Sequence, residues 1–304
     1  MSLTIEEAGQ LVKDSLLTCY KALEAAGKDA KKIEGKQIDV STKGDQIVGD
    51  AIINYLRNYK TPFVLYTEEK GKVELRPKCS HSIIFDDIDG TLNFKEGMGM
   101  LPFGTILGVF ENTDPTFNDC IASGFLEYNS GNLFYANRGQ GAYSIEKFAR
   151  GKREEARIRT SGRKSMEGSS SLKLALDIYS LGSLAPIFAK YSGQNNWLGD
   201  FRCKLVHIAQ IAYGAQDLLV FADNYSNRNK RSTAEELASG YLLVKEAGGS
   251  VLNWKGKDVG PEKVGLPEKR TFDIVMGSTE ELVREFLKQI YASPEIASYM
   301  KNKI

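Results

Sequence analysis

The chain has 304 residues, of which 42% are hydrophobic and 26% charged, so it can build a sizeable core and wholesale disorder is excluded. Its 40 basic and 39 acidic residues give a formal net charge of +1, which lacks the overall positive charge typical of nucleic-acid binding. No apolar run approaches the roughly 20 residues of a membrane span, and the acidic start MSLTIEEAGQ does not resemble a secretion signal. Four scattered cysteines and two histidines argue against zinc. We therefore expect a cytoplasmic protein that binds neither nucleic acid nor membranes, and any metal site must use mainly oxygen ligands.

The first half of the chain predicts two helices and then a series of strands. Apolar residues recur every three or four positions from Thr4 to about Ala26 and again from about Gly44 to Asn58, which is the period of an amphipathic helix. Short apolar runs predict the strands Phe63–Tyr66, Ser82–Phe85, Thr105–Phe110, Ile121–Tyr128 and Leu133–Ala136. A hairpin turn at residues 129–132 joins the last two, so this part indicates an antiparallel meander.

The second half alternates helix and strand. The predicted helices are Leu174–Tyr191, Lys204–Tyr213, Ala234–Ala247 and a last one capped by Ser278 with Glu281. The predicted strands lie around Trp197 and at Asp217–Phe221 and Phe272–Met276. A basic stretch at 147–164, interrupted by acidic residues, reads as a solvated edge. We predict an N-terminal half at 1–165, which carries most of the site, and a C-terminal half at 166–304.

The segment SIIFDDIDGTLNF is the most informative part of the chain. Its apolar strand ends in the carboxylates Asp86, Asp87 and Asp89. Such closely spaced carboxylates repel one another unless a cation lies among them, and Mg²⁺ prefers hard oxygen ligands. Gly90 and Thr91 then begin a new turn, whose backbone N–H groups are suited to phosphate oxygens. The segment therefore predicts a site for a metal ion and a phosphate.

Two acidic features lie upstream of this segment. Glu68 and Glu69 end the preceding strand, and Asp45 lies at the start of a helix. By itself the glutamate pair is typical of a solvated loop, and Asp45 of a helix cap. Because strand ends on one edge of a sheet converge, Glu68 and Asp86 could meet there.

The ordered set of motifs resembles the inositol monophosphatase and fructose-1,6-bisphosphatase superfamily of Mg²⁺-dependent, lithium-sensitive phosphatases. That family carries T-x-x-D, G-E-E, D-P-I-D-G-T-x-N-F and E-A-G-G in this order. Here these segments read TKGD (Thr42–Asp45), TEE (Thr67–Glu69), DDIDGTLNF (Asp86–Phe94) and KEAGG (Lys245–Gly249), and the resemblance spans roughly residues 5–292. It implies an α/β (α+β layered) fold, the αβαβα sandwich of the sugar-phosphatase type, and a homodimer.

The resemblance also implies which residues bind metal. Glu68, Asp86 and the carbonyl oxygen of Ile88 would hold a first Mg²⁺, and Asp86 and Asp89 would share a second, with two or three ions in all. Glu236 would complete the ligand set. The ions would polarise the phosphoryl group and activate water.

Further roles concern catalysis and the substrate. Asp45 and Thr91, together with Glu68, would orient or deprotonate a water that attacks in line, without a covalent intermediate. The N–H groups of Gly90 and Thr91 would bind the phosphate. Asp89 and Glu236 would also contact the substrate, and segments 198–200, with Gly199, and 223–228 would form its wall.

The chain departs from the family pattern in three places. Asp87 replaces a proline, and Thr67 replaces the glycine before Glu68. Glu236 stands where the family has the aspartate of W-D-x-A-A, and no tryptophan precedes it. Glutamate is one methylene longer but can still bind a metal ion, and it could equally form a capping box with Thr233.

Two other interpretations compete with this one. The strand that precedes D-I-D-G-T-L also fits the haloacid dehalogenase motif, in which Asp87 would be a nucleophile that becomes phosphorylated. The departure at Glu236 also motivates a non-catalytic binding module. Both fit less well, because about 80 residues with their own motif precede the strand and the other acidic and hydroxyl groups are intact.

The sequence thus predicts Mg²⁺-dependent hydrolysis of a small phosphomonoester. Inositol 1-phosphate is the first candidate, because Asn93 and Phe94 follow D-G-T as in the inositol branch. Fructose 1,6-bisphosphate comes next, because some relatives accept both. A 3′-phosphoadenosine 5′-phosphate phosphatase is third, because that branch tends to carry a different residue pair there.

Overall fold

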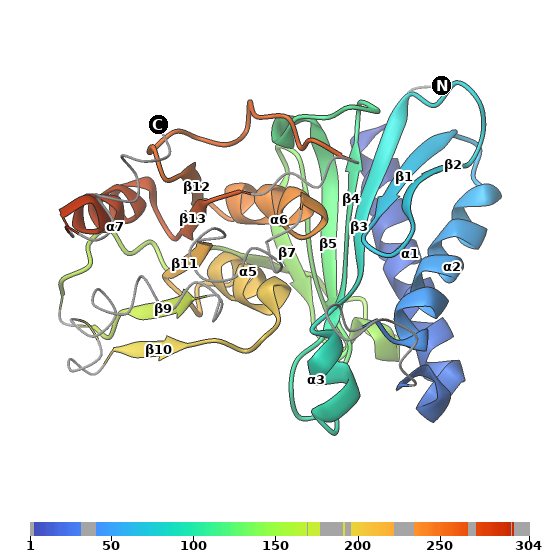
Figure 1. Ribbon diagram of the computed structural model, residues 1–304, viewed down its shortest axis with the longest axis horizontal. Coiled ribbons are helices and arrows are strands. Elements are labelled where there is room, and N and C mark those ends of the chain that lie inside the picture. The colour runs from blue at the N-terminus through green and yellow to red at the C-terminus, as the bar shows by residue number, and fades with distance from the viewer. Residues whose placement is uncertain are drawn as a thin grey trace.

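The computed structural model describes residues 3–31, 41–168, 170–176, 191, 196–221, 234–266, 272–292 and 294. Two β-sheets and three layers of helices alternate across the molecule (Figure 1). In the described part of the chain, no helix is both long and apolar enough to cross a membrane. The predicted division of the chain at residue 165 stays a prediction.

The larger sheet has eight strands in the order β2-β1-β3-β4-β5-β6-β7-β8. β1 and β3 run parallel, and the strands from β3 to β8 form an antiparallel meander, which confirms the predicted meander. The short strands β2 and β8 were not predicted, because they offer few apolar positions in a row, whereas β7 begins in the segment Asn132–Tyr143, whose sequence resembles a hairpin of the family. The bounds are β1 Phe63–Thr67, β2 Gly71–Glu74, β3 His81–Asp89, β4 Gly104–Phe110, β5 Cys120–Glu127, β6 Asn132–Asn137, β7 Gly141–Ile145 and β8 Ala156–Ile158.

Two N-terminal helices, α1 (Ile5–Ala26) and α2 (Lys43–Arg57), cover one face of this sheet. Each begins with a capping box, Thr4 with Glu7 and Thr42 with Asp45, in which side chain and backbone satisfy each other's N–H groups. Their apolar stripes pack on side chains of alternate strand positions to form one continuous core. Both predicted helices are confirmed.

The smaller sheet has the order β10-β9-β11-β13-β12. The predicted helix from Leu174 is wrong at its start, because residues 173–176 form β9, and most of its remainder lies outside the described residues. A short buried apolar run such as Leu174–Leu176 does not distinguish a strand from a helix by periodicity. The bounds are β9 Lys173–Leu176, β10 Trp197–Gly199, β11 Leu218–Phe221, β12 Ser250–Asn253 and β13 Ile274–Gly277.

Helices α5 (Lys204–Ala212) and α6 (Ala234–Glu246) lie between the two sheets, and α7 (Glu280–Ala292) covers the outer face of the smaller one (Figure 1). From Ala234 to Val244 every residue of α6 is buried, as expected for a helix enclosed by two sheets. The resulting layers confirm the predicted αβαβα sandwich. Among the described residues, the remaining short helices are α3 (Thr91–Glu96) and the 3₁₀ turns Gly27–Lys31, Phe117–Asp119 and Phe148–Arg150.

The predicted cap of the last helix is wrong by one residue. Thr279 Oγ1 accepts a hydrogen bond from the backbone N–H of Leu282, whereas Ser278 Oγ donates to the carbonyl oxygen of Arg163. Ser278 therefore ties the strand end to a neighbouring loop instead of capping the helix. The cap predicted for α6, Thr233, lies outside the described residues.

Candidate active site

The site begins with an irregularity at the end of β3. Asp86 lies opposite Ile106 of β4 and Asp89 opposite Gly104, so three steps along β3 match two steps along β4. This extra residue is a β-bulge. In a regular strand, side chains three positions apart point to opposite faces. The bulge therefore allows Asp86 and Asp89 to face the same side.

Asp86, Asp89 and Glu236 of α6 form a buried cluster in which their ligand atoms lie within 4.8 Å of one another. Within the described residues, Asp86 Oδ1 is buried without a hydrogen-bond partner. Burial, and then the negative charge of Glu68, raise the pKa of Asp86 well above its usual range. Three converging carboxylates with an unsatisfied oxygen fit a divalent cation such as Mg²⁺, which binds hard oxygen ligands.

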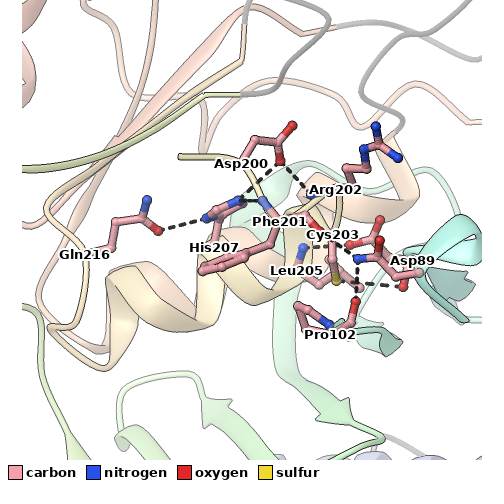
Figure 2. Close-up of polar contacts among 10 residues, drawn as sticks. Asp89, Pro102, Asp200, Phe201, Arg202, Cys203, Leu205, His207 and Gln216 are labelled. Atoms are coloured by element: carbon pink, nitrogen blue, oxygen red, sulfur yellow. Dashed lines mark hydrogen bonds and ion pairs between the residues drawn. The ribbon is translucent and has the colours of Figure 1, made fainter. Parts of the chain in front are cut away.

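A segment before α5 holds Asp89 in place. The backbone N–H of Leu205 donates to Asp89 Oδ2 at 2.8 Å, and Cys203 Sγ contacts the Asp89 carbonyl oxygen at 3.8 Å (Figure 2). Asn93 Nδ2, from the D-G-T-L-N motif, donates to the carbonyl oxygens of Pro102 and Phe201 at 2.8 and 2.6 Å. These bonds connect the strand-end motif to the start of α5 and fix the distance between the two halves of the site.

His207 supports the same segment from behind. Its Nε2 accepts the backbone N–H of Phe201 at 3.0 Å, and its Nδ1 lies 3.1 Å from Gln216 Oε1 (Figure 2). His207 is buried and hydrogen-bonded, and its role is to position the loop that contacts Asn93.

Asp45 is both a helix cap and a neighbour of Thr91. Its Oδ2 accepts hydrogen bonds from the backbone N–H and the hydroxyl of Thr42, both at 2.7 Å. Thr91 Oγ1 lies 2.9 Å from the carbonyl oxygen of Ile88 and 3.4 Å from Asp45 Oδ1. Burial raises the pKa of Asp45 to about 6, and the hydrogen bonds from Thr42 partly oppose this shift. The two sequence-based interpretations of Asp45, cap and site residue, are therefore compatible.

Asp87 points away from the cluster, toward α2. Thr67 Oγ1 donates to its Oδ2 at 2.7 Å, and a Cβ atom added at Gly49 would meet its Oδ1 at 2.4 Å. Its carboxyl group thus lies against Thr67 and Gly49, away from the Asp86 cluster, which argues against its use as a nucleophile on a substrate there. The two departures from the family pattern at Thr67 and Asp87 thus compensate each other, because the new hydroxyl supplies a hydrogen bond to the new carboxylate.

The other predicted residues lie around this core. Glu68 follows β1 in a partly buried turn, and it acts on Asp86 through its charge without joining the group within 4.8 Å. Gly90 adopts the left-handed φ of +82° and precedes the first turn of α3, where a side chain would be strained. Gly199 ends β10, one residue before the loop that contacts His207. The predicted wall at 223–228 lies outside the described residues.

Sequence reasoning missed Lys204, the first residue of α5. Its Nζ contacts Glu236 Oε1 at 3.0 Å and Oε2 at 2.9 Å. A signal was present, because a lysine in the first turn of a helix is unfavourable for the helix dipole and therefore suggests an acidic partner elsewhere. The E-A-G-G motif also has an unforeseen role, since Glu246 accepts the backbone N–H groups of Gly139 and Gly141 in the β6–β7 turn.

Comparisons with known proteins agree with this geometry. The profile of the inositol monophosphatase family matches residues 3–292. A fructose-1,6-bisphosphatase/inositol-1-monophosphatase of Thermococcus kodakarensis is 26% identical over 84% of this chain and 85% of its own length. A bifunctional NADP phosphatase/NAD kinase of Methanococcus maripaludis is 25% identical over 64% of this chain and 34% of its own length.

The fold has solved relatives as well. A hypothetical protein from Pyrococcus horikoshii, with similarities for inositol-1 monophosphatase, superposes with a TM-score of 0.71 over 94% of this chain and 98% of that one. Its sequence is 18% identical, so this likeness concerns the fold. Because the family profile covers nearly the whole sequence, the chain belongs to the inositol monophosphatase family and is a phosphoric monoester hydrolase.

Proposed function

We propose that this enzyme hydrolyses a small phosphomonoester in a Mg²⁺-dependent reaction, with inositol 1-phosphate as the first candidate and fructose 1,6-bisphosphate as the second. The observation that carries the proposal is the buried cluster of Asp86, Asp89 and Glu236. Three buried carboxylates that lie together repel one another unless a cation lies among them. A divalent cation there can bind and polarise the phosphate group of a substrate. The homodimer suggested by the resemblance stays a prediction.

The cluster would hold the metal ions, with Glu68 and the carbonyl oxygen of Ile88 as further ligands. When bound, Mg²⁺ would supply the positive charge that polarises the phosphoryl group and lowers the pKa of the attacking water. The Ile88 carbonyl oxygen already accepts the Thr91 hydroxyl at 2.9 Å and has a second lone pair for a ligand bond. The N–H groups of Gly90 and Thr91 would bind the non-bridging phosphate oxygens.

Thr91 and Asp45 would handle the proton of the attacking water. Thr91 Oγ1 can accept that proton once its hydroxyl turns from the Ile88 carbonyl oxygen and passes its own proton to Asp45 Oδ1, 3.4 Å away. A carboxyl group whose pKa is about 6 is mostly ionised at pH 7, so Asp45 can accept the proton. The water oxygen then forms the new bond to phosphorus as the ester bond breaks, and the leaving alkoxide takes a proton from solvent to become the alcohol.

Phosphate release tests the proposal. Wild type, Asp89→Asn and the exposed control Asp114→Asn are assayed with and without Mg²⁺. The substrates are inositol 1-phosphate, fructose 1,6-bisphosphate, 3′-phosphoadenosine 5′-phosphate and NADP, the last because one relative is an NADP phosphatase. We expect Mg²⁺-dependent release that Asp89→Asn abolishes and Asp114→Asn retains, and the preferred substrate identifies the branch. No release from any of the four by folded protein would contradict the proposal.

A further inference from the structure

The contact between Lys204 and Glu236 carries an inference about metal binding. Lys204 Nζ lies 2.9 and 3.0 Å from the two carboxylate oxygens of Glu236, so the ammonium group contacts both. The side chains are 18% and 10% exposed. Such a pair is shielded from water, so leaving Glu236 without its positive partner costs more than breaking a typical surface ion pair.

The position of Lys204 is hard to explain without the cluster. It is the first residue of α5, where the helix dipole disfavours a positive charge. The next residue, Leu205, donates its backbone N–H to Asp89. The first turn of α5 therefore contacts the carboxylate cluster at two points. Leu205 donates a hydrogen bond to Asp89, and the positive charge of Lys204 lies against Glu236.

We propose that Lys204 is a built-in counter-cation that competes with the divalent ion for Glu236. It reduces the repulsion among three buried carboxylates when no metal is bound, and it must turn away before both Glu236 oxygens can face an ion. Metal binding thus replaces the Lys204 ammonium group at Glu236 with the divalent ion. This competition lowers the affinity for the ion that Glu236 binds. This inference rests on the metal use stated under the proposed function.

The alternative role, in which Lys204 orients Glu236 for the metal, predicts the opposite change in metal affinity. If Lys204 only oriented Glu236 for the metal, its removal would weaken metal binding, whereas a competitor's removal strengthens it. The measurement is calorimetric titration of metal-free protein with Mn²⁺, without substrate. The variants are Lys204→Met, Lys204→Arg, Glu236→Gln and the double variant. Lys245→Met is the matched control, because Lys245 lies on α6, like Glu236, and forms an ion pair with Asp258 at 2.7 Å.

We expect Lys204→Met to bind Mn²⁺ about tenfold more tightly than wild type, the scale of one buried charge contact. Lys204→Arg and Lys245→Met should bind like wild type. In the Glu236→Gln background, the gain from Lys204→Met should shrink to the smaller part that comes from the Lys204 charge acting on Asp89. Metal-free Lys204→Met should also melt at a lower temperature than wild type and gain more from Mn²⁺.

Unchanged or weaker Mn²⁺ binding by Lys204→Met would overturn the inference. If that variant does not fold, Lys204→Gln, which keeps a donor but no charge, replaces it with the same expected direction. A wild type that binds no Mn²⁺ at all would contradict the proposed function itself. That failure is therefore distinguishable from a failure of Lys204 as a competitor.

Discussion

On the two faces of β3, adjacent aspartates have different neighbours. Asp86 faces α6 and meets Asp89 and Glu236, while Asp87 faces α2 and meets Thr67. Both carboxyl groups are 1% exposed, so burial alone does not distinguish them. The difference lies in the neighbours, because one face gathers negative charges that need a cation and the other supplies a hydroxyl donor. Adjacent acidic residues on a strand therefore lie in two different environments, because their side chains point to opposite faces.

Substitution of Asp45 should have the largest effect on activity. The charge of Asp45 acts on Asp87, and its carboxylate also contacts the Thr91 hydroxyl. We expect Asp45→Asn to lower kcat by about 100-fold or more, as for the loss of a general base. Asn can still accept the hydrogen bonds from Thr42, so the helix cap should survive. Steady-state kinetics together with Mn²⁺ titration check this. A variant that loses metal binding instead would place Asp45 among the ligands.

Gly49 tests how tightly the Asp87 face is closed. A Cβ atom there would lie 2.4 Å from Asp87 Oδ1, which must shift. We expect Gly49→Ala to lower the free energy of unfolding by about 1–3 kcal/mol, the usual cost of overpacking. Urea unfolding measures it, and Asp87→Ala in the same chain should remove most of the loss. Equal losses with and without Asp87→Ala would show that another contact is responsible.

Thr67 tests the compensation between the two departures from the family pattern. We expect Thr67→Val to cost about 1–3 kcal/mol of unfolding free energy, because it leaves a buried carboxyl oxygen without its donor. Thr67→Ser, which keeps the hydroxyl, is the control and should cost less. The Thr67→Val penalty should shrink in an Asp87→Ala background. A penalty of the same size there would mean that Thr67 acts independently of Asp87.

The pH dependence of stability tests the burial of Asp87 most specifically. Burial raises the pKa of Asp87 to about 8, so between its unfolded pKa near 3.8 and pH 8 the folded state binds more protons than the unfolded state. Stability therefore falls as pH rises through this window, by up to about 1.4 kcal/mol per pH unit for one proton. Metal-free Asp87→Asn should show a shallower fall between pH 5 and 8. Identical slopes in chemical unfolding of both proteins would contradict the assignment.

The strands and helices that frame the site could be predicted from periodicity and from the order of the motifs. The predicted ends of β1 and β3 and the start of α2 do lie together, with Asp45 near Thr91 and Glu68 acting on Asp86. Glu236, located by counting back from the E-A-G-G motif, lies beside Asp86. The order of the motifs was sufficient here, because each motif fixes its residues relative to a strand or helix of the family's fold.

The remaining features depend on contacts between distant segments. The bulge that aligns Asp86 with Asp89 depends on the register with β4, which the spacing of two aspartates does not reveal. The bond from Thr67 to Asp87 joins two parallel strands, and that of Lys204 to Glu236 joins two helices. The start of β9 was assigned to a helix because a short apolar run fits both structures.

The central claim is that the Asp86 face binds the divalent ion and the Asp87 face does not. Its most direct test is Mn²⁺ titration of metal-free Asp86→Asn and Asp87→Asn, two adjacent substitutions that each remove one charge. We predict that Asp86→Asn loses Mn²⁺ binding, while Asp87→Asn keeps the wild-type affinity. Equal losses in both variants, or a loss only in Asp87→Asn, would contradict the account.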